Sequence, residues 1–480
     1  MLKKLNKIKN NEIETSGTTN LNGEIIAINK HPRTDKLINV ILCIIIFLIP
    51  LLTIPRMLAL DWYNIPKYIA LIICGVILFI CLILKRKELK FDLIDKTALA
   101  FLALIIISTI FSINVPKAIL GEENRYEGLL SFIVYFLTYY CAKYYFSYNK
   151  YLIKFAIATV SISSIIGILQ YYNLFPLYYI FNVPFVPSFA SATFGNRNFF
   201  GSFLSMIVPF FIALYIIKGK KVYFIISLLS FFGILVSMTR SAWVGLVAAI
   251  ILGIIYIVKN FNREILKRTI NLTISCLIIF VFVLMPPKFI TDLIEKNANL
   301  NSIMGRFDLI SEDLGKLFGD ATEQEKGNAG AGRIRIWILT LKSISQTPLL
   351  GTGPDTLKDA LVHNVTIDVI NNFKENHTVI DKAHNEYLQI AATIGIPALI
   401  IYLAFVAQIL AKQKDLFKNS TIFIFIVAII SYLVQAFFNI STIGVAPIFW
   451  LLLGAIQNEE FKSEMRDEKW EVRNLKNFKT

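Results

Sequence analysis

The chain contains about twelve apolar runs, and most of them approach the ~20 residues with which an α-helix crosses the roughly 30 Å hydrocarbon core of a bilayer. A hydrophobic fraction of 56% and a mean hydropathy of +0.62 agree with this pattern. The runs are continuous rather than alternating, which favours helices over the strands of a membrane barrel. We therefore predict an all-α, polytopic membrane protein with about 12 transmembrane helices.

The predicted spans lie at residues 37–55, 66–84, 97–114, 129–147, 152–172, 199–217, 222–238, 242–258, 269–285, 389–410, 421–438 and 443–456. Lysines and arginines cluster in every second connecting loop, at 85–90, 143–154, 218–221, 259–268 and 412–418. Positive charge beside a span marks the cytoplasmic side of the membrane. Both termini are then cytoplasmic, and the intervening loops face outward.

Three regions follow from this pattern. Residues 1–36 are rich in Asn and Lys and lack hydrophobic periodicity, so we predict a disordered cytoplasmic tail. Residues 37–456 form the membrane domain, in which one large outer loop, about 286–388, should contain short helices. Residues 457–480 form a cytoplasmic C-terminal tail. The first apolar run lacks a small-residue cleavage site and is expected to be a permanent anchor.

The net charge of +15 is explained by this topology, because cations beside the spans can pair with anionic lipids of the inner leaflet. Nucleic-acid binding is not needed to account for it. All five cysteines lie in or at the end of apolar runs, where we expect them to pack as small hydrophobic residues. No metal-ligand spacing or nucleotide-binding motif is recognisable, so we expect neither a metal nor a cofactor.

Three arginines stand in short outer loops, where the positive-inside rule depletes cations: Arg125, Arg197 and Arg240. A single arginine at such a place can simply extend to the lipid headgroups. Three together favour a shared anion site.

The large outer loop adds an amphipathic stretch that begins at Arg333 and runs to Ser345. Helical geometry places Arg333 on one face with Trp337 and directs Arg335 elsewhere, so Arg333 is the better ligand candidate. The alternative is an interfacial helix whose arginines meet headgroups and whose tryptophan joins the aromatic belt.

His384 lies where the outer loop meets the next predicted span. A histidine has a pKa of about 6.5 and can accept a proton at neutral pH, which suits a general base. Asn385, Glu386 and Gln389 place hydrogen-bonding groups around it, and we expect these residues to orient the imidazole.

Together these segments resemble a known family. The motifs are Gly332-Arg333 followed by Trp337, the segment 348–353, the segment 383–389 with Gly395, and the upstream segments 194–198 and 239–241. In this order they resemble the O-antigen ligase superfamily, which also includes O-antigen polymerases and protein O-oligosaccharyltransferases. The resemblance covers roughly residues 120–456. Arg197 departs from the family pattern, which often has proline at this position.

The resemblance implies a metal-independent membrane glycosyltransferase without a cofactor. Such an enzyme moves a glycan from a polyprenyl-diphosphate carrier, such as undecaprenyl diphosphate, to the hydroxyl of a glycan, lipid or protein acceptor on the outer face of the plasma membrane. By motif, His384 is the expected base, and Arg240 and Arg333 the expected diphosphate ligands. Arg125, Arg197 and Arg335 are further candidates for donor binding.

Two other functions stay open. A polymerase of the same superfamily uses a second lipid-linked glycan as acceptor and builds a ladder of products. A solute transporter has a similar number of helices, but transporters place ionisable or unwound segments near the bilayer midplane. Here the spans hold almost no charge at their centres, and the polar residues gather outside.

Overall fold

The computed structural model describes residues 32–54, 61–147, 150–172, 190–285, 332–367, 379–413 and 416–465, together with 308, 311–313, 315–316, 330 and the strand pairs 18–19 and 25–26. Its helices are α2 (Pro32–Leu51), α3 (Asn64–Leu84), α4 (Leu93–Ile110), α5 (Val115–Leu120), α6 (Leu129–Tyr145), α7 (Lys150–Tyr171), α9 (Arg197–Lys218), α10 (Lys221–Val236), α11 (Arg240–Lys259), α12 (Arg263–Leu284), α16 (Arg333–Gln346), α17 (Leu357–Asn364), α19 (Glu386–Thr393), α20 (Ile396–Lys412), α21 (Ser420–Ala436) and α22 (Ala446–Ala455). A short antiparallel pair joins β1 (Thr18–Thr19) and β2 (Ile25–Ile26).

Each predicted span except 389–410 coincides with a single helix. Seven of the described helices are long and apolar enough to cross a membrane: α2, α3, α4, α7, α9, α11 and α12. α10, α20, α21 and α22 are apolar but shorter. The prediction of an all-α, polytopic membrane protein is therefore confirmed.

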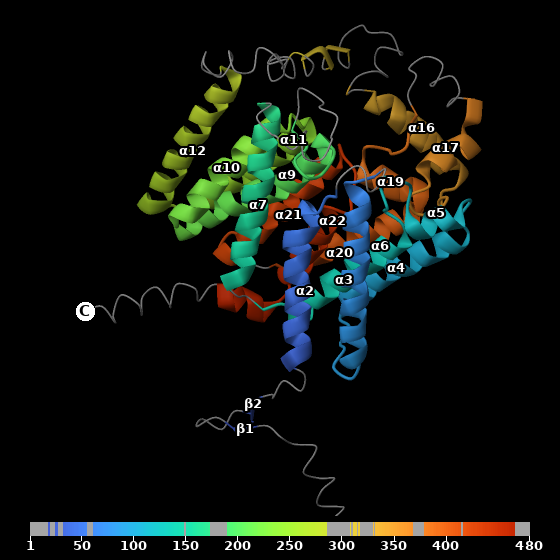
Figure 1. Ribbon diagram of the computed structural model, residues 1–480, viewed down its shortest axis with the longest axis horizontal. Helices are drawn as coiled ribbons and strands as arrows, with labels where there is room; N and C mark the ends of the chain where they lie inside the picture. Colours follow the sequence, from blue (N-terminus) through green and yellow to red (C-terminus); the bar gives the residue numbers. More distant parts are fainter. Residues whose placement is uncertain are drawn as a thin grey trace, which may run out of the picture.

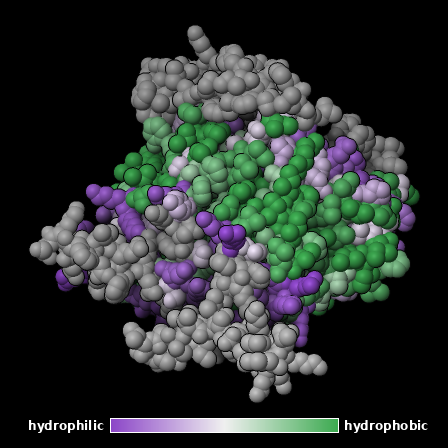
Figure 2. All heavy atoms as spheres, turned by 60° about the horizontal axis from the view of Figure 1, so that its bottom comes forward, coloured by the Kyte–Doolittle hydropathy of each residue, from purple (hydrophilic) through white to green (hydrophobic). Residues whose placement is uncertain are grey.

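The helices pack around α9, which contacts α10, α11 and α21. Most of α9 is buried, whereas α12 stands at the edge of the bundle and buries little of its surface. Figure 2 shows a broad hydrophobic surface across one face of the molecule, with hydrophilic residues at its margins. A surface of this kind suits contact with lipid tails.

The loop helices gather at one end of the bundle. α16 and α17 lie opposite the end at which α2 begins (Figure 1). α16 packs against α17 and α19, and α19 packs against α20. The prediction of short helices in the large loop is confirmed for the described part, whereas most of 286–331 lies outside the described residues.

The predicted span 389–410 is wrong as a single helix. It is broken between α19 and α20 at Gly395, whose φ of +109° is a conformation that other residues rarely adopt. A Cβ on this glycine would lie 2.2 Å from the carbonyl oxygen of Leu349. The segment 348–353 crosses the break, since the Ile396 N–H donates to the Pro348 carbonyl (2.8 Å) and the Gly353 N–H to the Thr393 carbonyl (2.8 Å).

The structure describes part of the predicted C-terminal tail but little of the predicted N-terminal tail. Beyond the boundary at 456, Phe461 and Met465 are buried, and the Asn458 side chain donates to the carbonyls of Ala142 (3.1 Å) and Phe146 (2.8 Å). Residues 457–465 therefore pack against the helical bundle, and their place in a cytoplasmic tail stays a prediction. The predicted N-terminal tail lies outside the described residues apart from the two short strands and the start of α2. All five cysteines are unpaired, and four are buried, as expected of small apolar side chains.

Candidate active site

Four of the described helices begin with an arginine, and three of these arginines are candidate site residues: Arg197 of α9, Arg240 of α11 and Arg333 of α16. The fourth is Arg263 of α12, in a predicted cytoplasmic loop. The first N–H groups of a helix lack internal partners and carry partial positive charge, so helix starts favour anions. An arginine at this position adds to that charge instead of offsetting it. Each helix start is therefore strongly cationic.

The starts of α9, α11 and α16 lie close together although they are distant in the sequence. The Thr239 hydroxyl, just before α11, donates to the Arg197 carbonyl at 2.9 Å. A Cβ on Gly201 would lie 2.5 Å from the Thr239 side chain, so α9 and α11 approach closely here. Burial and, to a smaller extent, the positive charge of Arg240 lower the pKa of Arg333 to about 10. The start of α16 thus lies near that of α11.

The counter-ions are unevenly distributed over this cluster. Arg240 Nη1 pairs with Asp313 Oδ2 at 2.5 Å. The negative charge of Asp313 also acts on Arg333. Among the described residues, however, no carboxylate lies within ion-pair distance of Arg333 itself. The cluster therefore carries excess positive charge.

His384 adjoins this cluster, and its backbone adopts a positive φ of 49°. Its Nδ1 atom is buried and has no hydrogen-bond partner among the described residues. Burial, together with the positive charges of Arg333, Arg125 and Lys382, lowers the pKa of His384 to about 4, an effect that Asp381 partly opposes. The imidazole is therefore neutral at pH 7 and able to accept a proton.

The residues before His384 are held by three other elements. Trp337 of α16 donates its indole N–H to the Ala383 carbonyl at 3.0 Å. Arg125 Nε and Nη2 donate to Asp381 Oδ2 at 3.0 and 2.6 Å. Lys382 forms a buried ion pair with Asp355. Residues 381–383 are therefore each held by a contact with another part of the chain.

The contacts of Trp337 bear on the two predictions made for α16, which are a helix that presents Arg333 to a ligand and an interfacial helix. Its ring packs edge-on against Phe437 with centroids 5.5 Å apart, and its indole N–H is used inside the protein. This placement favours a role in building the site over a place in an interfacial aromatic belt.

The expected orienting residues have other partners. Asn385 Oδ1 caps α19 by accepting from the Leu388 N–H at 3.0 Å. Glu386 accepts from tyrosines of α20 and α21, and Gln389 Oε1 accepts from the Ala383 N–H at 2.9 Å. None of the three is hydrogen-bonded to the imidazole. The prediction that they orient it is corrected: they shape α19 and the turn before it.

The remaining predicted arginines divide into two groups. Arg125 joins the cluster through Asp381 and lies over the ring of Phe199, 5.3 Å from its centroid. The Arg197 backbone borders the cluster through its bond with Thr239. Arg335 follows Arg333 on α16, and helical geometry directs it to a different face, as the sequence predicted.

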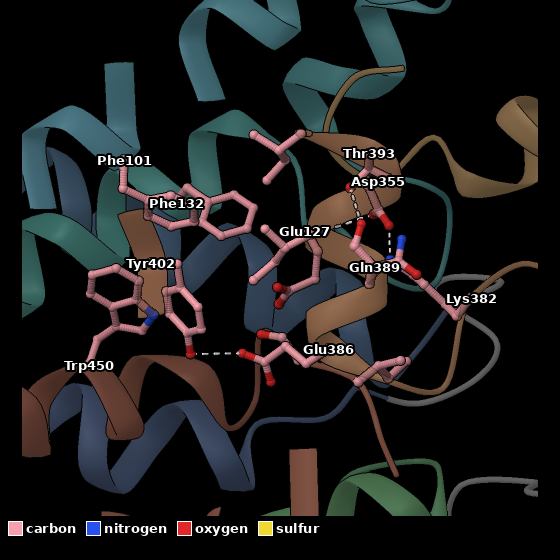
Figure 3. A pocket seen from close by; sticks show the side chains of 14 residues that line it. Phe101, Glu127, Phe132, Asp355, Lys382, Glu386, Gln389, Thr393, Tyr402 and Trp450 are labelled. Atoms are coloured by element: carbon pink, nitrogen blue, oxygen red, sulfur yellow. Dashed lines mark hydrogen bonds and ion pairs between the residues drawn. The ribbon is translucent and has the colours of Figure 1, made fainter. Parts of the chain in front are cut away.

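A second group of polar residues lies behind α19. Sequence reasoning named Glu386 and Gln389 from it but missed Glu127, Asp355 and Lys382. Glu127, Asp355, Lys382, Glu386 and Gln389 line a cavity of about 40 Å³ (Figure 3). Two signals were available: Glu127 belongs to the same loop as Arg125, and Lys382 stands two residues before His384. Within the described part of the chain, no group of three His, Cys, Asp or Glu side chains is placed to hold a metal ion.

Residues 225–403 match the family model described as O-Antigen ligase. The matched segment runs from α10 into α20 and includes Arg240, Arg333 and His384. No curated protein matches the chain. The family supports a membrane protein of the glycan ligase or polymerase type, with a lipid-linked glycan and an acceptor as its general partners. This match over residues 225–403 supports the resemblance to the O-antigen ligase superfamily that was inferred from the motifs.

Proposed function

We propose that the protein transfers a glycan from a polyprenyl-diphosphate carrier to an acceptor hydroxyl on the outer face of the plasma membrane, during assembly of a surface polysaccharide or glycoprotein. One observation carries this proposal. Arg333 is partly buried, has no carboxylate partner among the described residues, and lies within electrostatic reach of both Arg240 and His384. A desolvated charge without a counter-ion is costly, so the site suits an anion that arrives with the substrate.

A glycosyl diphosphate has the chemistry to match this cluster. Guanidinium groups bind phosphate oxygens through paired hydrogen bonds, and Arg240 and Arg333 supply two such groups. Negative charge grows on the diphosphate as it leaves, and fixed positive groups stabilise that charge most strongly in the transition state. Arginines then supply the electrostatic stabilisation of a metal-independent reaction. Arg125, Arg197 and Arg335 are candidates for further contacts with the donor.

His384 acts as the base in this proposal. The acceptor oxygen attacks the anomeric carbon, and the bond from that carbon to the diphosphate oxygen breaks with its electron pair leaving on the diphosphate. The hydroxyl proton moves to the imidazole, and the anomeric configuration inverts. In the empty site the positive charge of Arg333 contributes to the low pKa of His384. A bound diphosphate offsets that charge, so donor binding raises the basicity of His384.

The orientation in the membrane is supported by two features. The lysine-rich loops alternate with the loops that carry Arg125, Arg197 and Arg240, as the positive-inside rule requires of an outer site. α16 and α17 lie at the end of the bundle opposite the start of α2 (Figure 1). Both termini are then cytoplasmic, and the isoprenoid chain of the donor lies in the bilayer beside the helices.

The test is a transfer assay in proteoliposomes with a lipid-linked glycan and a purified acceptor. His384→Ala should lower turnover by about 10² to 10⁴, the usual contribution of a general base. His363→Ala is the matched control, since His363 lies on α17 and bonds to its neighbour Asn364. Undiminished turnover by His384→Ala contradicts the proposal. A product formed in one step marks a ligase, whereas a ladder of products marks a polymerase.

A further inference from the structure

Two carboxyl groups point toward one another across the cavity behind α19 (Figure 3). Glu127 ends the loop that carries Arg125, and Glu386 is the first residue of α19, immediately after the His384 turn. Both are almost completely buried, at 6% and 7% exposure. The cavity therefore joins the two segments that hold the candidate active site.

The hydrogen bonds of this cavity are incomplete. Glu127 Oε1 accepts from the Tyr135 hydroxyl at 2.5 Å, and the Ser441 hydroxyl, which also lines the cavity, lies close enough to favour the ionised carboxylate. Glu127 Oε2 is nevertheless buried and forms no hydrogen bond of normal geometry with a described residue. Gln389 Nε2, which belongs to another residue lining the cavity, is also buried without a described partner. Glu386 accepts from Tyr402 at 3.2 Å and from Tyr432 at 3.0 Å. One hydrogen-bond donor, Gln389 Nε2, and one acceptor, Glu127 Oε2, therefore lack a hydrogen-bond partner in the described part of the chain, and both belong to residues on the wall of the same cavity.

The charges of the cavity do not balance if every acid is ionised. Asp355 accepts the backbone N–H groups of Glu122 (2.7 Å) and Glu127 (3.0 Å) and pairs with Lys382, so its charge is compensated. Lys382 also attracts Glu127. No second cation among the described residues lines the cavity, and Glu386 is left with tyrosine donors alone. Two ionised carboxylates sharing one buried site are unfavourable, so such pairs bind protons.

We propose that Glu127 and Glu386 form a proton-binding site in which Glu386 carries one proton, and that an ordered water in the cavity bridges Glu127 Oε2 and Gln389 Nε2. A cavity of about 40 Å³ has room for a water molecule. Burial, together with the charge of Glu127, raises the pKa of Glu386 to about 7, although the hydrogen bonds from Tyr432 and Tyr402 act in the opposite direction. The groups that face the pair are Tyr135 from α6, Tyr402 from α20, Tyr432 from α21, and Lys382 and Asp355 from the outer segments.

The proton links the Arg125 loop to α19. When both carboxyl groups ionise, their repulsion acts between these two segments and loosens the support of His384. The effect on transfer rests on the proposed function, but the proton site itself does not. Because the pKa of Glu386 is raised from 4.5 to about 7, the folded protein keeps this proton where the unfolded chain loses it. The contribution of this proton to stability should therefore fall as pH rises from 4.5 to about 7. The lowered pKa of His384 acts in the opposite direction between about 4 and 6.5, so the contribution is measured as the difference between the wild type and Glu386→Gln.

The experiment is infrared spectroscopy of the full chain in lipid nanodiscs, with the proton as the only ligand. Below pH 7 the wild type should show the C=O band of a protonated carboxyl group, which shifts in D₂O and disappears as pH rises. Glu386→Gln should lose this titrating band. Glu127→Gln should keep it but titrate at lower pH, because the neighbouring charge is gone. Glu123→Gln, at an exposed position of the same loop, is the matched control and should behave as wild type.

Three results would overturn the proposal: no titrating band in the wild type, a band that persists in Glu386→Gln, or an unchanged midpoint in Glu127→Gln. Thermal unfolding gives a second readout, in which the stability of the wild type relative to Glu386→Gln should fall between pH 4.5 and about 7. Equal pH dependence in the two proteins would also count against it. Because neither measurement uses a glycan, failure of the transfer assay does not affect them.

Discussion

α6 connects two charged clusters at opposite ends of the bundle, and they differ in how their charges are paired. At its end, Lys143 binds Asp95 at 2.8 Å, and Asp95 also accepts from Tyr139 (3.0 Å) and Tyr144 (2.5 Å). Near its start lies a second cluster, here called the outer cluster, of Arg125, Arg240, Arg333 and His384. In it, Arg333 has no carboxylate partner among the described residues. Both clusters contain buried charge, but only the cluster with incompletely paired charge is assigned a role in the proposed function.

The largest expected effect is the loss of transfer activity when Arg333 is replaced. Arg333→Met should lower glycan transfer by about 10² to 10³, the usual cost of losing one group that stabilises developing negative charge. It should not lower the free energy of unfolding, because Arg333 forms no ion pair with a carboxylate among the described residues. Arg333→Lys should restore only part of the activity, since lysine lacks the planar fork. Lys342→Met, at an exposed position of the same helix, is the control, and equal losses in both variants would remove the distinction.

The paired cation should behave in the opposite way. Lys143→Met leaves the fully buried Asp95 carboxylate without its cation, and breaking such a pair costs about 3–5 kcal/mol of unfolding free energy. Transfer per folded molecule should stay unchanged. Denaturant unfolding in detergent, combined with the transfer assay, measures both effects. Unaltered stability would show that this cluster does not hold the fold together.

The pH dependence of transfer tests the outer cluster without a substitution. A histidine with a pKa of about 6.5 is roughly nine-tenths protonated at about pH 5.5, which would cost about tenfold in rate. With a pKa of about 4, His384 stays neutral there, so kcat/KM should hold until the pH approaches that value. The acid limb of kcat should lie at higher pH, because bound donor raises the pKa of His384. A kcat/KM limb near the ordinary histidine value would contradict the described environment.

The smallest expected effect concerns the tether between α16 and the His384 turn. Trp337→Phe keeps an aromatic ring but removes the hydrogen bond to the Ala383 carbonyl, which is worth about 1 kcal/mol or roughly fivefold in rate. Trp243→Phe is the matched control, because it removes a similar bond to the Ile234 carbonyl at 3.2 Å. Equal rates for the two variants would mean that the tether does not position His384.

Hydropathy predicted the helices because lipid imposes one rule on every span: backbone polar groups must be satisfied within the helix. The break at Gly395 escaped prediction because the apolar run continues through it. Its cause is the backbone of residues 348–353, which comes from a distant part of the sequence. Periodicity within one segment cannot reveal such a contact.

The sequence likewise predicted only part of the candidate site. The cationic side chains could be selected because outer arginines are unusual, but their counter-ions could not, since Asp313 and Asp381 lie among many similar acids. Glu386 was assigned to His384 because the two are close in sequence. In the structure the first turn of α19 directs its carboxylate toward Tyr402 and Tyr432 instead.

The central claim is that the outer arginine cluster binds a diphosphate. The most direct measurement is the affinity of the catalytically silent His384→Ala protein for a polyprenyl-diphosphate-linked glycan, with and without Arg333→Met. A charge-assisted hydrogen bond contributes about 1.5–3 kcal/mol, so the second substitution should weaken binding by roughly tenfold to 150-fold. Equal affinity in the two proteins would contradict the account.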